Sequence, residues 1–205
     1  TAVMGYDPGE PFNTEFVRIR LIEGGVTALV LYRNRVQEFT IPDLDRSDYV
    51  LMLGANPVAS NGSLMTAPGV AKRLAALVAR GRLVVVDPRH TETAAIASEH
   101  LPIRPGADAW FLVALLDALR AIGPPRLAHY GARLADFDAA LAAIAPLAAD
   151  DVARRTGIDA TTTQRIAREL YAAPRAVVYG RMGLSTQAWG SLCQWLIQLL
   201  NIYTG

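Results

Sequence analysis

Four short runs of continuously apolar, β-prone residues constrain this sequence most strongly. Each run lacks the alternation of apolar and polar residues that marks a strand with one face in water. Strands of this kind are buried on both faces, which is typical of a parallel sheet covered by helices. The sequence therefore predicts a layered α/β fold, with strands at 26–32, 49–53, 82–87 and 175–180.

Helical patterns occupy most of the chain between these runs. Because strands and helices alternate, we expect an open, mostly parallel, Rossmann-like sheet with right-handed crossovers and helices on both faces. Thr161 is expected to cap one helix, since Gln164 follows at the spacing of a capping box. The predicted helices lie at 68–81, 108–121, 135–145, 150–155, 161–171 and 187–203.

The pattern divides the chain into two parts. Residues 45–205 are predicted to form one α/β domain, with 123–158 as a helical insertion at one side of the sheet. Residues 1–44 are harder to interpret, because a Pro- and Gly-rich opening is followed only by a weak helical pattern at 12–22. We expect this segment to pack on the sheet. The starting Thr1 suggests a chain cut from a longer protein.

Composition excludes several classes of protein. Hydrophobic residues make up 52% of the 205 residues and charged residues 19%, which predicts a globular chain. The net charge of +1 comes without a basic stripe, so nucleic acid is not an expected partner. No apolar run reaches the roughly 18 residues that a membrane span needs. Cys193 is alone, so a reducing, cytoplasmic location is expected, or a periplasmic one if a parent chain is exported.

Turn-forming residues follow the strand at 49–53. Gly54 permits a positive φ or a close approach of the backbone to a ligand. Asn56 can hydrogen-bond its own main chain or an external group, and Ala55 and Pro57 complete the turn. Exposed N–H groups in such a turn suit a phosphate. An ordinary strand-to-helix turn is the alternative, since short glycine motifs often match by chance.

A second polar loop, Asp87-Pro88-Arg89, follows the strand at 82–87, and Thr91 comes directly behind it. An aspartate at the carboxyl tip of a strand accepts hydrogen bonds from ribose hydroxyls in dinucleotide sites. An arginine can contact a phosphate with two hydrogen bonds. The alternative is that Asp87 only caps the turn and Arg89 is a solvated charge.

Two further stretches carry candidate binding residues. Gly106 forms a turn before Asp108, whose carboxylate either caps the next helix or accepts hydrogen bonds from guanine. In parallel α/β sheets, ligands bind beyond the carboxyl ends of the strands, so the loops favour a shared site for a nucleotide-bearing ligand. The loop after the last predicted strand adds four candidates, namely Met182, Gly183, Ser185 and Gln187.

The segments 45–74, 82–119 and 176–205 resemble the molybdopterin oxidoreductase family, which holds a bis(molybdopterin guanine dinucleotide) cofactor of molybdenum or tungsten. These segments closely resemble the formate dehydrogenase-like and nitrate reductase-like branches of the family. The resemblance implies that 54–57 lies on the nucleotide and diphosphate, and that 87–89 lies by the ribose and phosphates. It also implies that Gly106 and Asp108 contact the guanine. Met182, Gly183, Ser185 and Gln187 would then approach the pterin.

Two expected parts of such an enzyme are missing from this sequence. The family usually begins with a cysteine-rich iron–sulfur segment and later supplies a Cys, selenocysteine, Ser or Asp ligand to the metal. Cys193 lies in an apolar helix, so we interpret it as a core residue. We therefore assign no catalytic or metal-binding residue, leave enzymatic activity open, and expect any redox activity to need other domains or electron-transfer subunits.

Two other functions remain open. A stand-alone module that carries the cofactor or another guanine nucleotide would need the same loops. An NAD-type dehydrogenase domain is less well supported, because no complete GxGxxG motif follows a strand.

Overall fold

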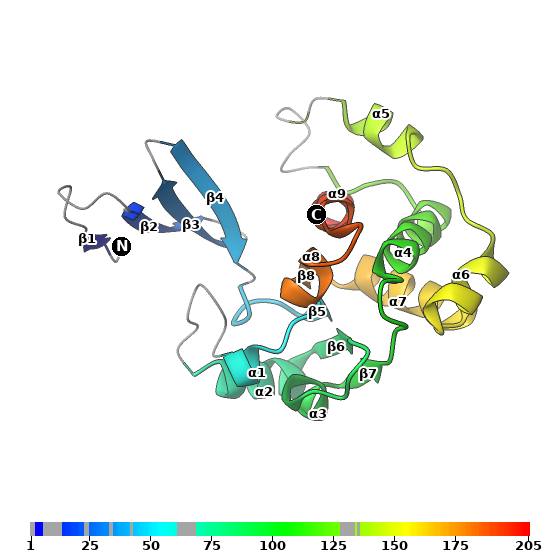
Figure 1. Ribbon diagram of the computed structural model, residues 1–205, viewed down its shortest axis with the longest axis horizontal. Helices are drawn as coiled ribbons and strands as arrows, with labels where there is room; N and C mark the ends of the chain where they lie inside the picture. Colours follow the sequence, from blue (N-terminus) through cyan, green and yellow to red (C-terminus); the bar gives the residue numbers. More distant parts are fainter. Residues whose placement is uncertain are drawn as a thin grey trace. The chain divides into compact units, whose positions relative to one another are not determined.

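The computed structural model describes residues 43–60, 69–127, 134 and 136–205, together with the backbone of four strands between residues 3 and 41. Contacts divide the chain into two units, Thr1–Leu44 and Asp45–Gly205. Figure 1 draws the described helices and strands of both units. Among the described residues, no helix combines the length and the apolar character needed to cross a membrane.

The first unit holds an antiparallel sheet in the order β1-β2-β3-β4. The helical pattern predicted at 12–22 is wrong for its described residues, because 14–22 form a strand. Arg18 and Arg20 alternate there with Val17, Ile19 and Leu21, which is the period of a strand. The run at 26–32 is a strand as predicted, but it pairs within this antiparallel sheet. The strands are β1 (Val3–Gly5), β2 (Thr14–Ile22), β3 (Gly25–Tyr32) and β4 (Arg35–Ile41).

The second unit confirms the predicted α/β class. Its four-stranded sheet is parallel in every pair and has the order β7-β6-β5-β8. The strands are β5 (Tyr49–Leu53), β6 (Arg82–Val86), β7 (Glu99–Leu101) and β8 (Ala176–Gly180). From β5 the chain first builds β6 and β7 on one side and then returns to place β8 on the other. The strand order therefore reverses between β5 and β8, which is where open α/β sheets bind ligands.

Helices cover both faces of this sheet (Figure 1). One face packs against α4 (Asp108–Ile122), α7 (Ala160–Ala172) and α9 (Gly190–Thr204), which share a core with Leu51 and Val84. The other face lies on the side of α2 (Val70–Arg80), where Leu74 and Leu77 are buried. Because successive side chains of a strand point to opposite faces, a strand between two helical layers must be apolar throughout. The remaining helices are α1 (Pro57–Ser60), α3 (Glu92–Ile96), α5 (Phe137–Ala142), α6 (Ala149–Thr156) and α8 (Met182–Ser185).

Several predicted helix ends are corrected by the structure. The N-cap of α7 is Asp159, whose carboxylate accepts from the Thr162 N–H at 2.6 Å, so Thr161 does not cap it. The last helix begins at Gly190 rather than at residue 187, because the short helix α8 intervenes. The insertion contributes α5 and α6 between α4 and α7, and the predicted helical residue 135 lies outside the described residues.

A network of ion pairs joins the strands at their amino ends, at the edge of the sheet opposite their carboxyl ends. Glu99 pairs with Arg82 and with Arg165 of α7, each at 2.5 Å. Glu169 pairs with the same two arginines at 3.1 and 2.8 Å. It also accepts from the hydroxyl of the buried Tyr49 at 3.0 Å. Burial and the Glu169 charge together raise the pKa of Tyr49. The network thus links β5, β6, β7 and α7.

Candidate functional site

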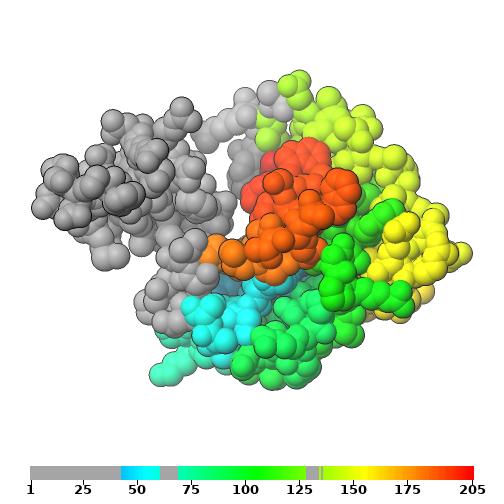
Figure 2. Space-filling view, in the orientation of Figure 1, coloured from blue at the N-terminus to red at the C-terminus, as the bar shows by residue number. Residues whose placement is uncertain are grey.

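The loops after β5 and β8 touch through two glycines. The Gly183 N–H donates to the Gly54 carbonyl at 2.9 Å, and Gly54 has a φ of +54°. A Cβ on Gly54 would lie 2.5 Å from the Leu184 nitrogen, and a Cβ on Gly183 would lie 2.9 Å from the Gly54 Cα. In Figure 2 the segment after β5 borders the segment after β8 on the visible face. The backbones of the loops after β5 and β8 are therefore in direct contact at the point where the strand order reverses.

Asn56 connects the first loop to α3. Its Oδ1 accepts from the Thr93 hydroxyl at 2.8 Å and from the Thr93 N–H at 3.2 Å. Its Nδ2 donates to Glu92 at 2.7 Å, and this hydrogen bond lowers the pKa of Glu92. The Asn56 side chain thus ties the turn after β5 to the helix that follows β6.

The second loop is organised around Asp87. Its Oδ1 accepts from the Arg89 N–H at 2.9 Å, so this carboxylate does close the turn, as the alternative interpretation held. A ring nitrogen of His100 lies 2.9 Å from the Asp87 carbonyl oxygen. Thr91 is the N-cap of α3 and accepts from the Ala94 N–H at 3.1 Å. These contacts fix the loop while the Asp87 side chain stays half-buried.

Asp108 and Gln187 lie side by side although 79 residues separate them in sequence. The Gln187 amide donates to Asp108 Oδ2 at 2.6 Å and to the Gly183 carbonyl at 2.7 Å. Asp108 is the first residue of α4, not its N-cap, and is only 3% exposed. Burial raises its pKa and the Asp87 charge raises it further, while the Gln187 hydrogen bond opposes the shift. This carboxylate is therefore an acceptor held in a partly desolvated position.

A pocket of about 420 Å³ opens at this edge of the sheet. Residues that follow β5, β6 and β8 all contribute to its walls. Arginines stand on the β6 and β8 loops, and Tyr179 of β8 is half-buried, which raises the pKa of its phenol. The lining consists of Gly54, Ala55, Asn56, Pro57, Ala59, Ser60, Asp87, Arg89, Thr91, Tyr179, Arg181 and Met182.

Not every predicted site residue lies in this pocket. Asp108, Gly183 and Gln187 are connected to its wall through the contacts described above. Pro88 and Gly106 are exposed and do not line it. Ser185 is also exposed and accepts from Gln194 at 2.8 Å. The candidates from sequence omitted four lining residues, namely Ala59, Ser60, Tyr179 and Arg181.

The described residues contain no group of three or more His, Cys, Asp or Glu side chains that could hold a metal ion. Cys193 is fully buried in α9. Burial, assisted by the Asp108 charge, raises the pKa of its thiol to about 11. This thiol is therefore protonated at neutral pH and packs as an apolar core residue.

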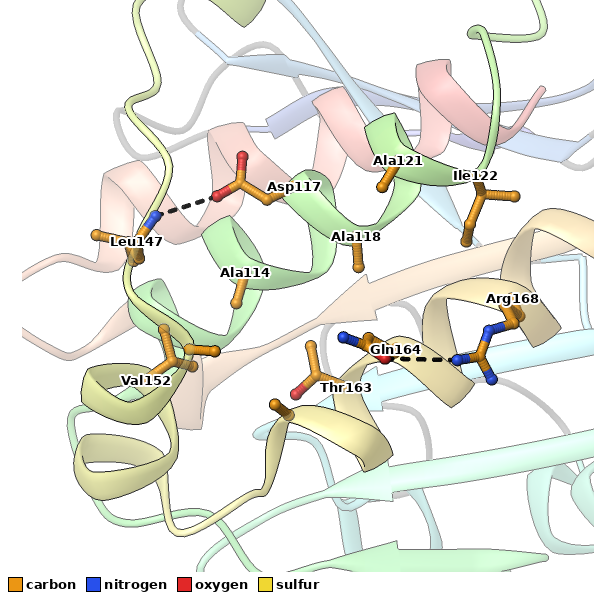
Figure 3. A pocket seen from close by; sticks show the side chains of 12 residues that line it. Ala114, Asp117, Ala118, Ala121, Ile122, Leu147, Val152, Thr163, Gln164 and Arg168 are labelled. Atoms are coloured by element: carbon orange, nitrogen blue, oxygen red, sulfur yellow. Dashed lines mark hydrogen bonds between the residues drawn. The ribbon is translucent and has the colours of Figure 1, made fainter.

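A second pocket, of about 480 Å³, lies between α4, α6 and α7 (Figure 3). Its apolar wall includes Ala114 and Ala118 of α4. Its polar side chains are engaged with the chain itself. Asp117 accepts from the Leu147 N–H at 3.3 Å and from Arg120 at 3.1 Å. The pocket formed by the loops after β5, β6 and β8 is the stronger candidate site, because it lies where the strand order reverses and open α/β sheets bind ligands at such a point.

A family model described as molybdopterin oxidoreductase matches residues 14–121. Nitrate reductase of Klebsiella oxytoca is 34% identical over 149 residues, which cover 73% of this chain and 16% of that protein. The putative dimethyl sulfoxide reductase chain YnfE of Escherichia coli K12 is 31% identical over 189 residues, covering 80% of this chain and 22% of that protein. The chain thus spans about a fifth of the length of these relatives.

Among solved structures, acetylene hydratase from Pelobacter acetylenicus matches with a TM-score of 0.67 at 22% sequence identity. The match covers 80% of this chain and 22% of that one. At this level of identity the similarity establishes a shared fold.

Proposed function

This chain belongs to the molybdopterin oxidoreductase family, and we propose that its unit Asp45–Gly205 binds the guanine dinucleotide arm of a molybdopterin cofactor. One observation carries the proposal. The loops after β5, β6 and β8 line one pocket at the point of strand reversal, and Gln187 joins Asp108 to Gly183, the residue next to the lining residue Met182. Open α/β sheets bind nucleotides at such a point.

The chemistry of the residues fits a guanine dinucleotide. Arg89 and Arg181 supply cationic groups for the diphosphate from two loops. Asp87 offers acceptors to a ribose. The Asp108 carboxylate matches the N1–H and N2–H₂ donors of guanine, and its burial would keep water from competing for those donors. Met182 and Gly183 would then face the pterin. A pocket of about 420 Å³ lies in the size range of small-molecule sites.

This unit would bind and orient the cofactor, whereas the redox reaction would take place at the metal of the cofactor. The metal of a bound molybdopterin would transfer two electrons or an oxygen atom, whereas the chain's own residues would orient the cofactor and exclude water from its nucleotide end. We propose that the redox reaction also needs domains comparable with the rest of the longer relatives, or separate electron-transfer subunits. By analogy with the nitrate and dimethyl sulfoxide reductases, the parent reaction would be a reduction of a small oxygen-bearing compound.

Titration of the purified 205-residue chain with GDP, GTP and NAD by calorimetry tests the proposal. We expect GDP and GTP to bind and NAD to bind at least tenfold more weakly, because NAD lacks the guanine donors. Asp108→Asn should weaken GDP binding about tenfold or more, since a hydrogen bond to a charged group contributes about 1.5–3 kcal/mol.

Asp117→Asn is the matched control for this titration. It makes the same substitution on the same helix but lies in the second pocket, so GDP affinity should stay within about twofold of the original, well under 1 kcal/mol. Preferential binding of NAD, or GDP affinity that is unchanged in Asp108→Asn, would contradict the assignment.

A further inference from the structure

The hydrogen bonds of the Asn56 side chain indicate a structural role within the protein rather than recognition of a ligand. An amide oxygen accepts two hydrogen bonds, and both are made by Thr93, through its hydroxyl and its N–H. The amide nitrogen donates to Glu92. The Oδ1 of Asn56 is therefore fully engaged with α3, and the loop has mainly its backbone to offer to the pocket.

Thr93 also holds the chain just beyond Asn56. Its hydroxyl accepts from the Val58 N–H at 3.2 Å while it donates to Asn56. Only a hydroxyl can donate and accept at one atom in this position, and Thr93 is fully buried, so water cannot replace it. One side chain therefore fixes both the amide of Asn56 and the first turn of α1.

We propose that Thr93 and Glu92 are positioning residues that hold the Asn56 turn in its ligand-binding shape. This inference rests on the proposed function of the pocket, and it assigns the hydrogen-bonding role of Asn56 to the interior of the protein. The same short helix carries Thr91, which lines the pocket. Helix α3 thus sets the relative position of the walls formed after β5 and after β6.

The first experiment combines amide hydrogen exchange by NMR with GDP titration of the 205-residue chain. Thr93→Val keeps the shape and the backbone N–H but removes the hydroxyl. We expect exchange at Val58 to rise at least tenfold and GDP affinity to fall about five- to tenfold. Thr93→Ser restores the hydroxyl and should return both quantities to within about twofold of the original, a difference of less than 1 kcal/mol.

Thr163→Val is the control for a purely structural loss. Thr163 is also buried, and its hydroxyl donates to the Asp159 carbonyl at 3.1 Å in α7. Its loss should lower thermal stability without changing Val58 exchange or GDP affinity. Should Thr93→Val fail to fold, Glu92→Ala is the substitute, because Glu92 is exposed. We expect it to weaken GDP binding two- to threefold, with Glu92→Gln near the original.

The possible failures are distinguishable. If the unsubstituted chain binds GDP and Thr93→Val binds it equally well, the positioning role is wrong and the proposed function stands. Unchanged exchange at Val58 in Thr93→Val also overturns the inference. If the unsubstituted chain binds no GDP, the proposed function fails, and the positioning role fails with it.

Discussion

At the scale of single residues, the contact between Gly54 and Gly183 leaves no room for a side chain. Gly54→Ala combines two costs. The positive φ costs about 1 kcal/mol in an L-residue. The new Cβ would lie 2.5 Å from the Leu184 nitrogen. The backbone would have to shift to relieve this overlap, at a cost of about 1–3 kcal/mol. We expect the free energy of unfolding to fall by about 2–4 kcal/mol, as measured by denaturant titration.

Substitution of Gly69 measures the cost of the positive φ without the cost of the steric overlap. It has a φ of +64°, and no described atom lies within 4 Å of the place that a Cβ would occupy. Gly69→Ala should therefore lose only about 1 kcal/mol. Equal losses in the two variants would mean that the two loops part easily, contrary to the structure.

Local sequence could identify Gly54, Asp87 and Asp108 as candidates but could not settle their contacts. The spacing before α4 left Asp108 as either a cap or a ligand-facing group, because both roles use the same residue type at the same position. The hydrogen bond that Asp108 accepts comes from Gln187, 79 positions away in the sequence, which no local pattern could predict. Thr93 was equally unreadable as a partner of Asn56, since a threonine in a short polar stretch carries no signal of burial.

At the scale of elements, the ion-pair network at the amino ends of the strands is the clearest target. Glu99 and Arg165 join β7 to α7 at 2.5 Å, with side chains 22% and 36% exposed. A double-mutant cycle of Glu99→Ala and Arg165→Ala should give a coupling energy of about 1 kcal/mol, because shared partners strengthen a pair but solvent screens it. The coupling should decrease in 1 M salt, at which screening is stronger.

The comparison for this cycle is the ion pair between Asp151 and Arg154 of α6, whose side chains are 47% and 69% exposed. An exposed pair on one helix should couple by about 0.5 kcal/mol or less. If the coupling energy between Glu99 and Arg165 does not exceed this value, the ion-pair network does not stabilise the packing of β5, β6, β7 and α7.

Elements were predictable where their pattern was strong and long. The structure confirms the predicted strand at 49–53 and the predicted helix that begins at Asp108. An apolar run and a helical repeat of this length are compatible with few other secondary structures. Strand β7 was missed because three residues carry no period. Strand β2 was misread because the alternation around Arg18 and Arg20 was outweighed by a weak helical spacing.

At the scale of the whole molecule, the second unit has a buried core of its own. Among the residues whose burial is described, its buried cluster runs from Tyr49 to Tyr203. A chain comprising 45–205 should therefore fold, with a midpoint of thermal unfolding within about 4 °C of the full chain, since 1 kcal/mol corresponds to about 2–4 °C at this size.

Circular dichroism and calorimetry measure this midpoint directly. A fall of more than about 10 °C, or loss of a cooperative transition, would mean that Thr1–Leu44 contributes to the stability of the second unit.

The order of the strands has a consequence for synthesis. Strand β5 pairs Tyr49 with Ala176, and Asp48 holds Arg175 across 127 positions through two hydrogen bonds at 2.9 and 2.8 Å. Contacts of such long sequence separation form late, because closing the intervening loop costs entropy before any pairing rewards it. A nascent chain still on the ribosome thus has β5, β6 and their loops ready, yet it lacks one wall of the pocket. The proposed binding of a ligand must therefore wait until synthesis has passed Met182, the last residue that lines the pocket.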